Sequence, residues 1–244
     1  MENGLLIVIM LAALPALGNF GGGLLAEWLQ PSGKTLNRAL HAATGIILAV
    51  VAVEVMPTAL AAAPSWLLAV AFVAGGGLYL VVEAGIERWQ AGRPEGAGKG
   101  AWMVYVAVAA DLIGDGLLIG AGSAVAVSMA LLLALGQVMA DIPEGFAVVA
   151  NFRDKGMSRA QRLGVSASFV VPVVGAALLA YFGLRGRSEP VKMAGLVFVA
   201  GLYTLAAVED MLHEAHESAE DTHWSAISFL AGFALFLLLS GLFG

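Results

Sequence analysis

The chain has 244 residues, of which 60% are hydrophobic and 12% are charged, and its mean hydropathy is +0.88. This composition excludes an ordinary soluble domain and predicts an integral membrane protein. The net charge of −6 comes without a basic patch, which excludes nucleic-acid binding, and the lack of cysteine excludes disulfides and thiolate metal sites.

Eight apolar segments follow one another along the chain, each close to the ~20 residues that a membrane-spanning helix needs. Apolar residues run continuously through them, which favours helices over the alternating strands of a barrel. The segments are 4–28, 37–61, 65–87, 101–124, 125–151, 160–184, 191–214 and 223–243. Their connections are short, so we expect residues 1–244 to form a single all-α transmembrane domain.

Lysine and arginine are divided unequally between the two sets of connections. Nine lie near the connections after the first, third, fifth and seventh segments, and three lie near the others. The positive-inside rule places the larger set in the cytoplasm, so both termini are expected to lie outside the cell membrane. The larger set is Lys34, Arg38, Arg88, Arg93, Lys99, Arg153, Lys155, Arg159 and Arg162, and the smaller set is Arg185, Arg187 and Lys192.

The fourth and fifth segments each carry two carboxylates and contain no lysine or arginine. Asp111 and Asp115 are four residues apart, so they lie on one helical face. Asp141 and Glu144 are three residues apart and also share a face. If the two helices are antiparallel neighbours, all four carboxylates can converge on one point.

These four carboxylates are costly within a bilayer. Each costs about 2.5–3.5 kcal/mol at mid-bilayer, or roughly 10–14 kcal/mol for the four if the costs add. Acidic residues in membrane spans mark functional sites by default. Protons or metal cations are therefore expected to compensate them.

Proline recurs inside four of the apolar segments, at Pro15, Pro57, Pro143 and Pro172. A proline ring removes one helical hydrogen bond, so Pro143 is expected to free the carbonyl of Met139 for a cation. Broken helices with polar groups at mid-membrane are typical of transporter sites.

The sequence Asp141-Ile142-Pro143-Glu144-Gly145, the related sequence Asp111 to Gly116 and the eight spans resemble the ZIP (Zrt/Irt-like protein) family of divalent metal transporters. The resemblance implies an eight-helix bundle in which helices 1–3 and 6–8 form inverted repeats around helices 4 and 5. It also implies a carrier rather than an enzyme, and it suggests a homodimer.

Carried over residue by residue, the resemblance makes Asp115 and Glu144 the central metal ligands, able to bridge two ions. Asp141 belongs to the same site, and Asp111 stands where the family usually has histidine. Met56, just before Pro57, corresponds to a thioether near the entrance of the site.

The cytoplasmic end of the seventh segment resembles the acidic, histidine-bearing release region of the family. Glu209 corresponds to an acidic residue on the release path. His213 and His216, three residues apart, can share a metal as an acceptor or regulatory site. The alternative for these two histidines is a solvated acidic helix end.

The sequence departs from the family pattern at four positions, namely Asp111 for histidine, Leu112 for asparagine or serine, Ala140 for a polar residue and Val171 for glutamate. We therefore expect one complete metal site rather than two. Without imidazole the site is rich in oxygen, which suits harder cations such as Mn²⁺, although Zn²⁺ also binds carboxylates.

The predicted function is uptake of a divalent metal ion (zinc, manganese, iron or cadmium) across the lipid bilayer into the cytoplasm, with the metal as cargo and no resident cofactor. Release is expected to involve protonation of Asp111 or Asp115, since clustered carboxylates disfavour one another's ionisation. One alternative is a proton channel or a proton-coupled carrier of another solute. A second is an intramembrane aspartyl protease using Asp115 and Asp141, although the Gly-x-Gly-Asp pattern of such proteases is absent and Pro15-Ala16-Leu17 precedes the aspartates.

Overall fold

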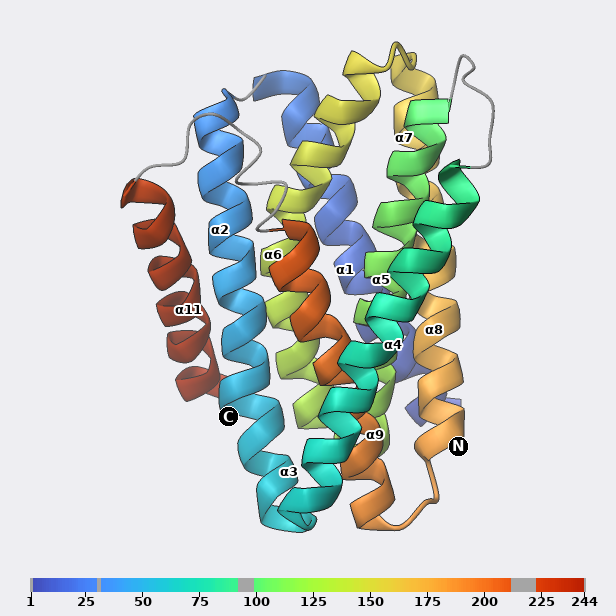
Figure 1. The fold of residues 1–244 in the computed structure, drawn as a ribbon, viewed down its shortest axis with the longest axis vertical. Coiled ribbons are helices and arrows are strands. Elements are labelled where there is room, and N and C mark those ends of the chain that lie inside the picture. Colours follow the sequence, from blue (N-terminus) through green and yellow to red (C-terminus); the bar gives the residue numbers. More distant parts are fainter. Residues whose placement is uncertain (1, 30–31, 92–98, 212–222, 244) are drawn as a thin grey trace.

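The computed structural model describes residues 2–29, 32–91, 99–211 and 223–243, and every regular element within these ranges is helical (Figure 1). Eight runs of helix there are long and apolar enough to cross a membrane. They are Gly4–Leu29, Gly33–Ala62, Ser65–Arg88, Val104–Val125, Val127–Asp154, Arg159–Leu184, Glu189–Glu209 and His223–Phe243. The eight predicted spans are thus confirmed, with boundaries shifted by up to five residues.

Five of the spans are formed by single α-helices, and the other three are composite. The single helices are α1 (Glu2–Leu29), α4 (Ser65–Ala91), α5 (Lys99–Val125), α6 (Val127–Asp154) and α11 (His223–Phe243). The composite spans are α2 (Gly33–Ala49) with the π-helix η1 (Val50–Val55) and α3 (Met56–Ala62), α7 (Arg159–Ser168) with α8 (Val170–Leu184), and α9 (Glu189–Ala206) with the π-helix η2 (Ala207–Met211).

Two of the four prolines lie next to irregular backbone, and two do not. The π-helix η1 ends just before Pro57, and the break between α7 and α8 falls at Phe169, three residues before Pro172. In both places the proline ring cannot donate to the preceding turn. In contrast, α1 runs through Pro15 and α6 runs through Pro143. The helix is therefore continuous at Pro15 and Pro143, because a membrane helix can absorb the loss of one hydrogen bond when its neighbours hold it. The free carbonyl expected at Met139 stays a prediction.

The helices associate most extensively as four pairs, namely α1 with α6, α5 with α8, α4 with α9 and α2 with α11. Glycine makes each pair close. A Cβ atom added at Gly145 of α6 would lie 1.8 Å from the carbonyl oxygen of Asn19, and one at Gly75 of α4 would lie 1.8 Å from that of Phe198. Comparable close approaches occur at Gly116 against α8 and at Gly45 against α11. Membrane helices commonly associate through such small residues.

The pairs assemble into two four-helix groups. The first contains α1, α5, α6 and the span α7–α8, and the second contains the spans of α2, α4, α9 and α11. The main contacts between the groups are α2 against α6 and α5 against α9. The C-terminal ends of α1, α4 and α6 lie at the end of the bundle opposite the α3–α4 turn (Figure 1). The two helices α5 and α6 that carry the paired carboxylates thus belong to one group and face the other.

Candidate metal centre

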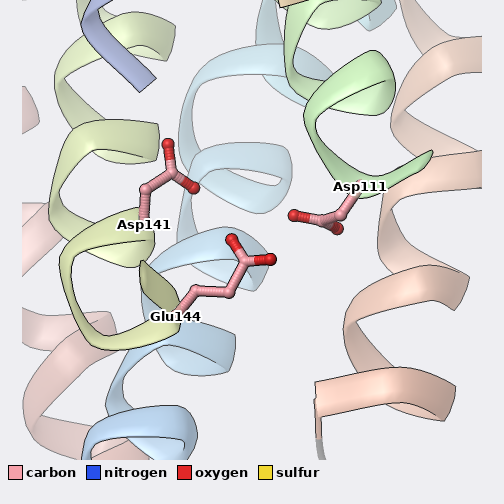
Figure 2. Close-up of side chains that lie close together, drawn as sticks. All are labelled: Asp111, Asp141 and Glu144. Carbon is pink, nitrogen blue, oxygen red and sulfur yellow. The ribbon is translucent and has the colours of Figure 1, made fainter. Parts of the chain in front are cut away.

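Three of the predicted ligands form a compact group inside the bundle. Asp111 on α5 and Asp141 and Glu144 on α6 bring carboxylate oxygens within 4.8 Å of one another, and Figure 2 shows the side chains turned toward a shared space. Asp141 and Glu144 are buried, whereas Asp111 is half-buried. Tetrahedral Zn–O bonds of about 2.0–2.2 Å place ligand oxygens about 3.3–3.6 Å apart. The three carboxylates therefore need to move roughly 1 Å closer together to hold one cation.

Asp115 lies deeper, beside Asp141 and Tyr203, and does not belong to this group of three. The reason is geometric. The helices α5 and α6 are antiparallel. The rise of about 6 Å from Asp111 to Asp115 along α5 therefore points in the opposite direction to the rise from Asp141 to Glu144 along α6. Asp111 then meets Glu144, and Asp115 meets Asp141. The resemblance had instead made Asp115 and Glu144 the central ligands.

The deeper part of the cluster is short of hydrogen-bond partners. Asp115 and Asp141 are each 0% exposed, and none of their four carboxylate oxygens makes a hydrogen bond of good geometry with a described residue. The Tyr203 hydroxyl lies beside Asp115 and is buried in the same condition, so these groups have only one another nearby. Buried polar groups in this condition cost several kcal/mol unless a ligand, proton or water satisfies them.

Two amide side chains near the carboxylates were missed as candidates. Asn19 on α1 donates from Nδ2 to Oε2 of Glu144 at 3.5 Å, and Gln137 on α6 donates from Nε2 to the backbone oxygen of Asp115 at 3.2 Å. Both side chains are 1% exposed. An amide inside an apolar span is the only sequence signal for them, and it does not distinguish a ligand from a packing contact.

A cavity of about 420 Å³ lies between α4, α5 and α9 and reaches the cluster at Asp111. Its wall is mainly apolar, but it also includes Glu83 and Glu87 of α4 and the ring of Tyr203 of α9. Neither Asp115 nor Asp141 lines this cavity. Asp111 therefore connects the enclosed carboxylates with the space between the two helix groups.

Four further ligands were predicted from the sequence, at Met56, Glu209, His213 and His216. Met56 is half-buried against the larger hydrophobic core. Glu209 is exposed within η2. His213 and His216 lie outside the described residues. The roles expected for these four residues stay predictions.

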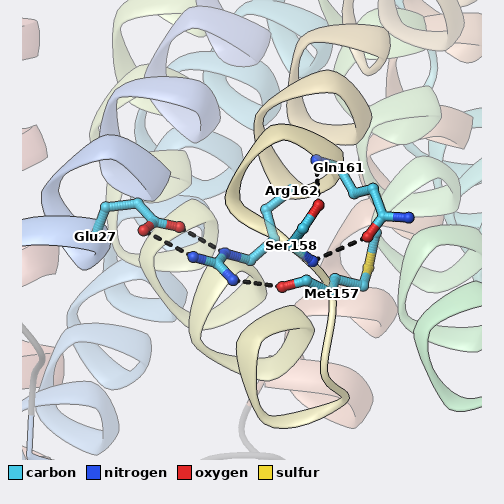
Figure 3. A network of polar contacts seen from close by, with 5 residues as sticks. All are labelled: Glu27, Met157, Ser158, Gln161 and Arg162. Carbon is cyan, nitrogen blue, oxygen red and sulfur yellow. Dashed lines mark hydrogen bonds and ion pairs between the residues drawn. The ribbon is translucent and has the colours of Figure 1, made fainter.

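A second polar network ties α1 to α7 near one end of the bundle (Figure 3). Arg162 donates from Nε to Oε1 of Glu27 at 2.5 Å and from Nη2 to Oε2 at 2.8 Å, and its Nη1 donates to the backbone oxygen of Met157. Ser158 and Gln161 cap the start of α7 reciprocally. This bidentate pair links the first and sixth spans within the group that carries the carboxylates.

The chain matches no protein-family model and no curated protein sequence.

Proposed function

We propose that this protein is a transporter that moves divalent metal cations across the cell membrane into the cytoplasm, through the carboxylates of α5 and α6. One observation carries the proposal. Carboxylates from two helices converge inside the bundle, and the oxygens of Asp115 and Asp141 are buried without a hydrogen bond of good geometry to any described residue. A doubly charged cation supplies the missing compensation and binds carboxylate oxygen well.

The packing of the helices supports a ZIP-like arrangement. An inverted repeat relates span 1 (α1) to span 6 (α7–α8), span 2 (α2–α3) to span 7 (α9), span 3 (α4) to span 8 (α11), and span 4 (α5) to span 5 (α6). Under this exchange the pair α1–α6 becomes α8–α5, and the pair α4–α9 becomes α11–α2; all four pairs are in close contact. The contact α2–α6 maps onto α9–α5 in the same way. This is the contact pattern expected of inverted repeats around the fourth and fifth helices.

The proposed transport step is a movement of the first helix group against the second. The cation enters from the outer side, exchanges water for the carboxylates, and passes Asp111 into the cavity between the groups. Glu83 and Glu87 on the cavity wall, and then Glu209, provide acidic contacts toward the cytoplasm. Alternating access of this kind is typical of transporters that bind their cargo between repeats.

The proposed orientation places both termini outside. The basic residues near the ends of α1, α4 and α6 then lie in the cytoplasm, and Arg185 and Arg187 lie outside. On the bundle surface, only 17% of the residues in the most apolar windows of α4 and α11 are buried. These faces are available to lipid or to a second copy in a homodimer.

Uptake into proteoliposomes tests the proposal. Purified protein should accumulate radioactive manganese and zinc, and Asp141→Asn and Glu144→Gln should each reduce uptake at least tenfold. Asp154→Asn, which changes an exposed carboxylate at the end of α6, is the matched control and should leave uptake intact. Uptake that equals empty vesicles, or that survives both site substitutions, would refute the proposal.

A proton carrier is the second candidate, because the same buried oxygens can be satisfied by protons. Divalent cations should raise the thermal unfolding temperature of a metal transporter. The unfolding temperature of a proton carrier should depend on pH and not on Mn²⁺ or Zn²⁺. A membrane protease using Asp115 and Asp141 should cleave a peptide substrate and lose that activity in Asp115→Asn.

A further inference from the structure

We propose that the side-chain oxygen of Asn19 is a ligand of the transported cation, so that three helices form the binding site. This inference rests on the proposed function and adds a ligand from α1. Nothing in the paired carboxylate motifs points to the first span.

The backbone of α1 is held against α6 at the level of the site. A Cβ atom at Gly18 would lie 2.9 Å from the carbonyl oxygen of Val138, and one at Gly22 would lie 1.9 Å from that of Ile142. From the other side, a Cβ atom at Gly145 would meet the carbonyl oxygen of Asn19. These glycines allow the two backbones to approach so closely that the short side chain of Asn19 reaches Glu144.

The polar end of Asn19 is enclosed and only half satisfied. The side chain is 1% exposed, its Nδ2 lies 3.5 Å from Oε2 of Glu144, and its Oδ1 is buried with no hydrogen-bond partner among the described residues. A distance of 3.5 Å is long for a hydrogen bond. The contact with Glu144 alone therefore gives little reason to bury an amide here.

An amide can serve this site in two ways. Rotation of the terminal torsion by about 180° exchanges the NH₂ group and the oxygen, which have nearly the same shape. The NH₂ group can donate to the Glu144 carboxylate when no cation is bound there. The oxygen suits a cation held by Glu144, because an N–H dipole pointing at a cation is repelled.

The added ligand affects selectivity. Asp111, Asp141, Glu144 and Asn19 offer oxygen alone, from three carboxylates and one amide. Carboxylate and carbonyl oxygens suit Mg²⁺, Ca²⁺ and Mn²⁺, whereas imidazole suits Zn²⁺ and Cu²⁺. Asn19 should therefore favour Mn²⁺ relative to Zn²⁺.

The test is equilibrium binding of Mn²⁺ and of Zn²⁺ to the purified full chain in detergent, with Asn19→Ala, Asn19→Asp and Asn19→His. Asn19→Ala should weaken Mn²⁺ binding about tenfold, and Asn19→Asp should restore it, since it returns an oxygen. Asn19→His should shift the Zn²⁺/Mn²⁺ affinity ratio at least tenfold toward zinc. Gly21→Ala is the matched control on the same helix, because nothing lies within 4 Å of a Cβ atom there.

The His variant separates a ligand from a hydrogen-bond donor. If Asn19 serves only to donate to Glu144, Asn19→His should leave the Zn²⁺/Mn²⁺ affinity ratio unchanged, because an imidazole that does not reach the cation cannot favour Zn²⁺. That result, or unchanged binding in Asn19→Ala, would overturn the inference. If wild-type protein binds Mn²⁺ and Asp141→Asn does not, the proposed function stands even when the inference fails. If wild-type protein binds neither cation, both fall.

Discussion

Asp111 differs from the other carboxylates of the site in its surroundings. It is half-buried and lines the cavity, whereas Asp115 and Asp141 are fully enclosed. In the proposed transport route, a cation that moves from the group of three into the cavity therefore passes Asp111. The side chain at this position should influence both how tightly the cation is held and which cation is preferred.

Asp111→His should shift the cation preference toward zinc. The substitution replaces a hard carboxylate oxygen with an imidazole nitrogen at the one site position that also lines the cavity. We expect the ratio of Zn²⁺ to Mn²⁺ uptake to rise at least fivefold in proteoliposomes. Asp111→Asn serves as the control, because it removes the charge and adds no imidazole. An unchanged ratio in Asp111→His would place Asp111 outside the route.

The Glu27–Arg162 pair should stabilise the fold rather than select the cargo. Each side chain is 9% exposed, so removing one partner leaves the other buried and poorly compensated. We expect Glu27→Gln and Arg162→Met each to lower the thermal unfolding temperature by several degrees. The double variant should lose less than the sum of the two single losses, because the partners are coupled. Additive losses would show that the two side chains act independently.

At the scale of elements, the glycine contacts control how closely the helices approach. Gly145 follows Glu144 directly, and it is covered by the backbone of Asn19 on α1. The atoms nearest to a methyl group at Gly145 are backbone atoms of Asn19, so no side chain can move aside to make room for it. The geometry of the carboxylates therefore depends on the separation between α1 and α6.

Gly145→Ala should separate α1 from α6 and weaken cation binding. Overpacking of this kind costs about 1–3 kcal/mol in well-packed interiors, and here the site lies at the point of contact. We expect at least tenfold weaker Mn²⁺ binding together with a lower unfolding temperature. Gly77→Ala on α4, where a Cβ atom has nothing within 4 Å, should change neither quantity. Wild-type binding in Gly145→Ala would show that the close contact is not needed.

The two π-helices have similar sequences, yet their π-helical conformation could not be predicted from those sequences. The segment Ala52–Met56 reads Ala-Val-Glu-Val-Met, and Ala207–Met211 reads Ala-Val-Glu-Asp-Met. Most of the first segment and all of the second are π-helical, and they lie in the second and seventh spans. The repeat is visible in the sequence, but no residue preference distinguishes a π-turn from an α-turn there. π-Helical turns occur frequently at functional sites.

At the scale of the molecule, the spans were predictable because bilayer thickness fixes the length of an apolar helix. The convergence of Asp111, Asp141 and Glu144 was also predictable, from helical periodicity and an antiparallel connection. The pairing of Asp111 with Glu144 follows from the same antiparallel connection, although the resemblance had placed Asp115 with Glu144. How closely the helices approach was not predictable, because it depends on glycine contacts between spans that are distant in the sequence. Asn19 reaches the site through the same kind of contact.

The orientation of the whole bundle in the membrane can be tested by labelling single introduced cysteines, because the sequence contains no cysteine of its own. Single cysteines can be placed in the natural sequence without removing any native thiol. Ser188, exposed before α9, lies on the expected outer side, and Asp154, exposed at the end of α6, lies on the expected cytoplasmic side. Neither substitution changes a basic residue, so the charge bias that sets the orientation is preserved.

In intact cells, Ser188→Cys should react with a membrane-impermeant maleimide, and Asp154→Cys should react only after the membrane is permeabilised. The wild-type chain is the unlabelled control. The reverse pattern would invert the bundle and make the proposed uptake an export. Equal labelling of both positions in intact cells would contradict a topology in which α7 and α8 together cross the membrane between Asp154 and Ser188. The assay therefore tests the orientation and the sixth span together, independently of whether any cation is bound.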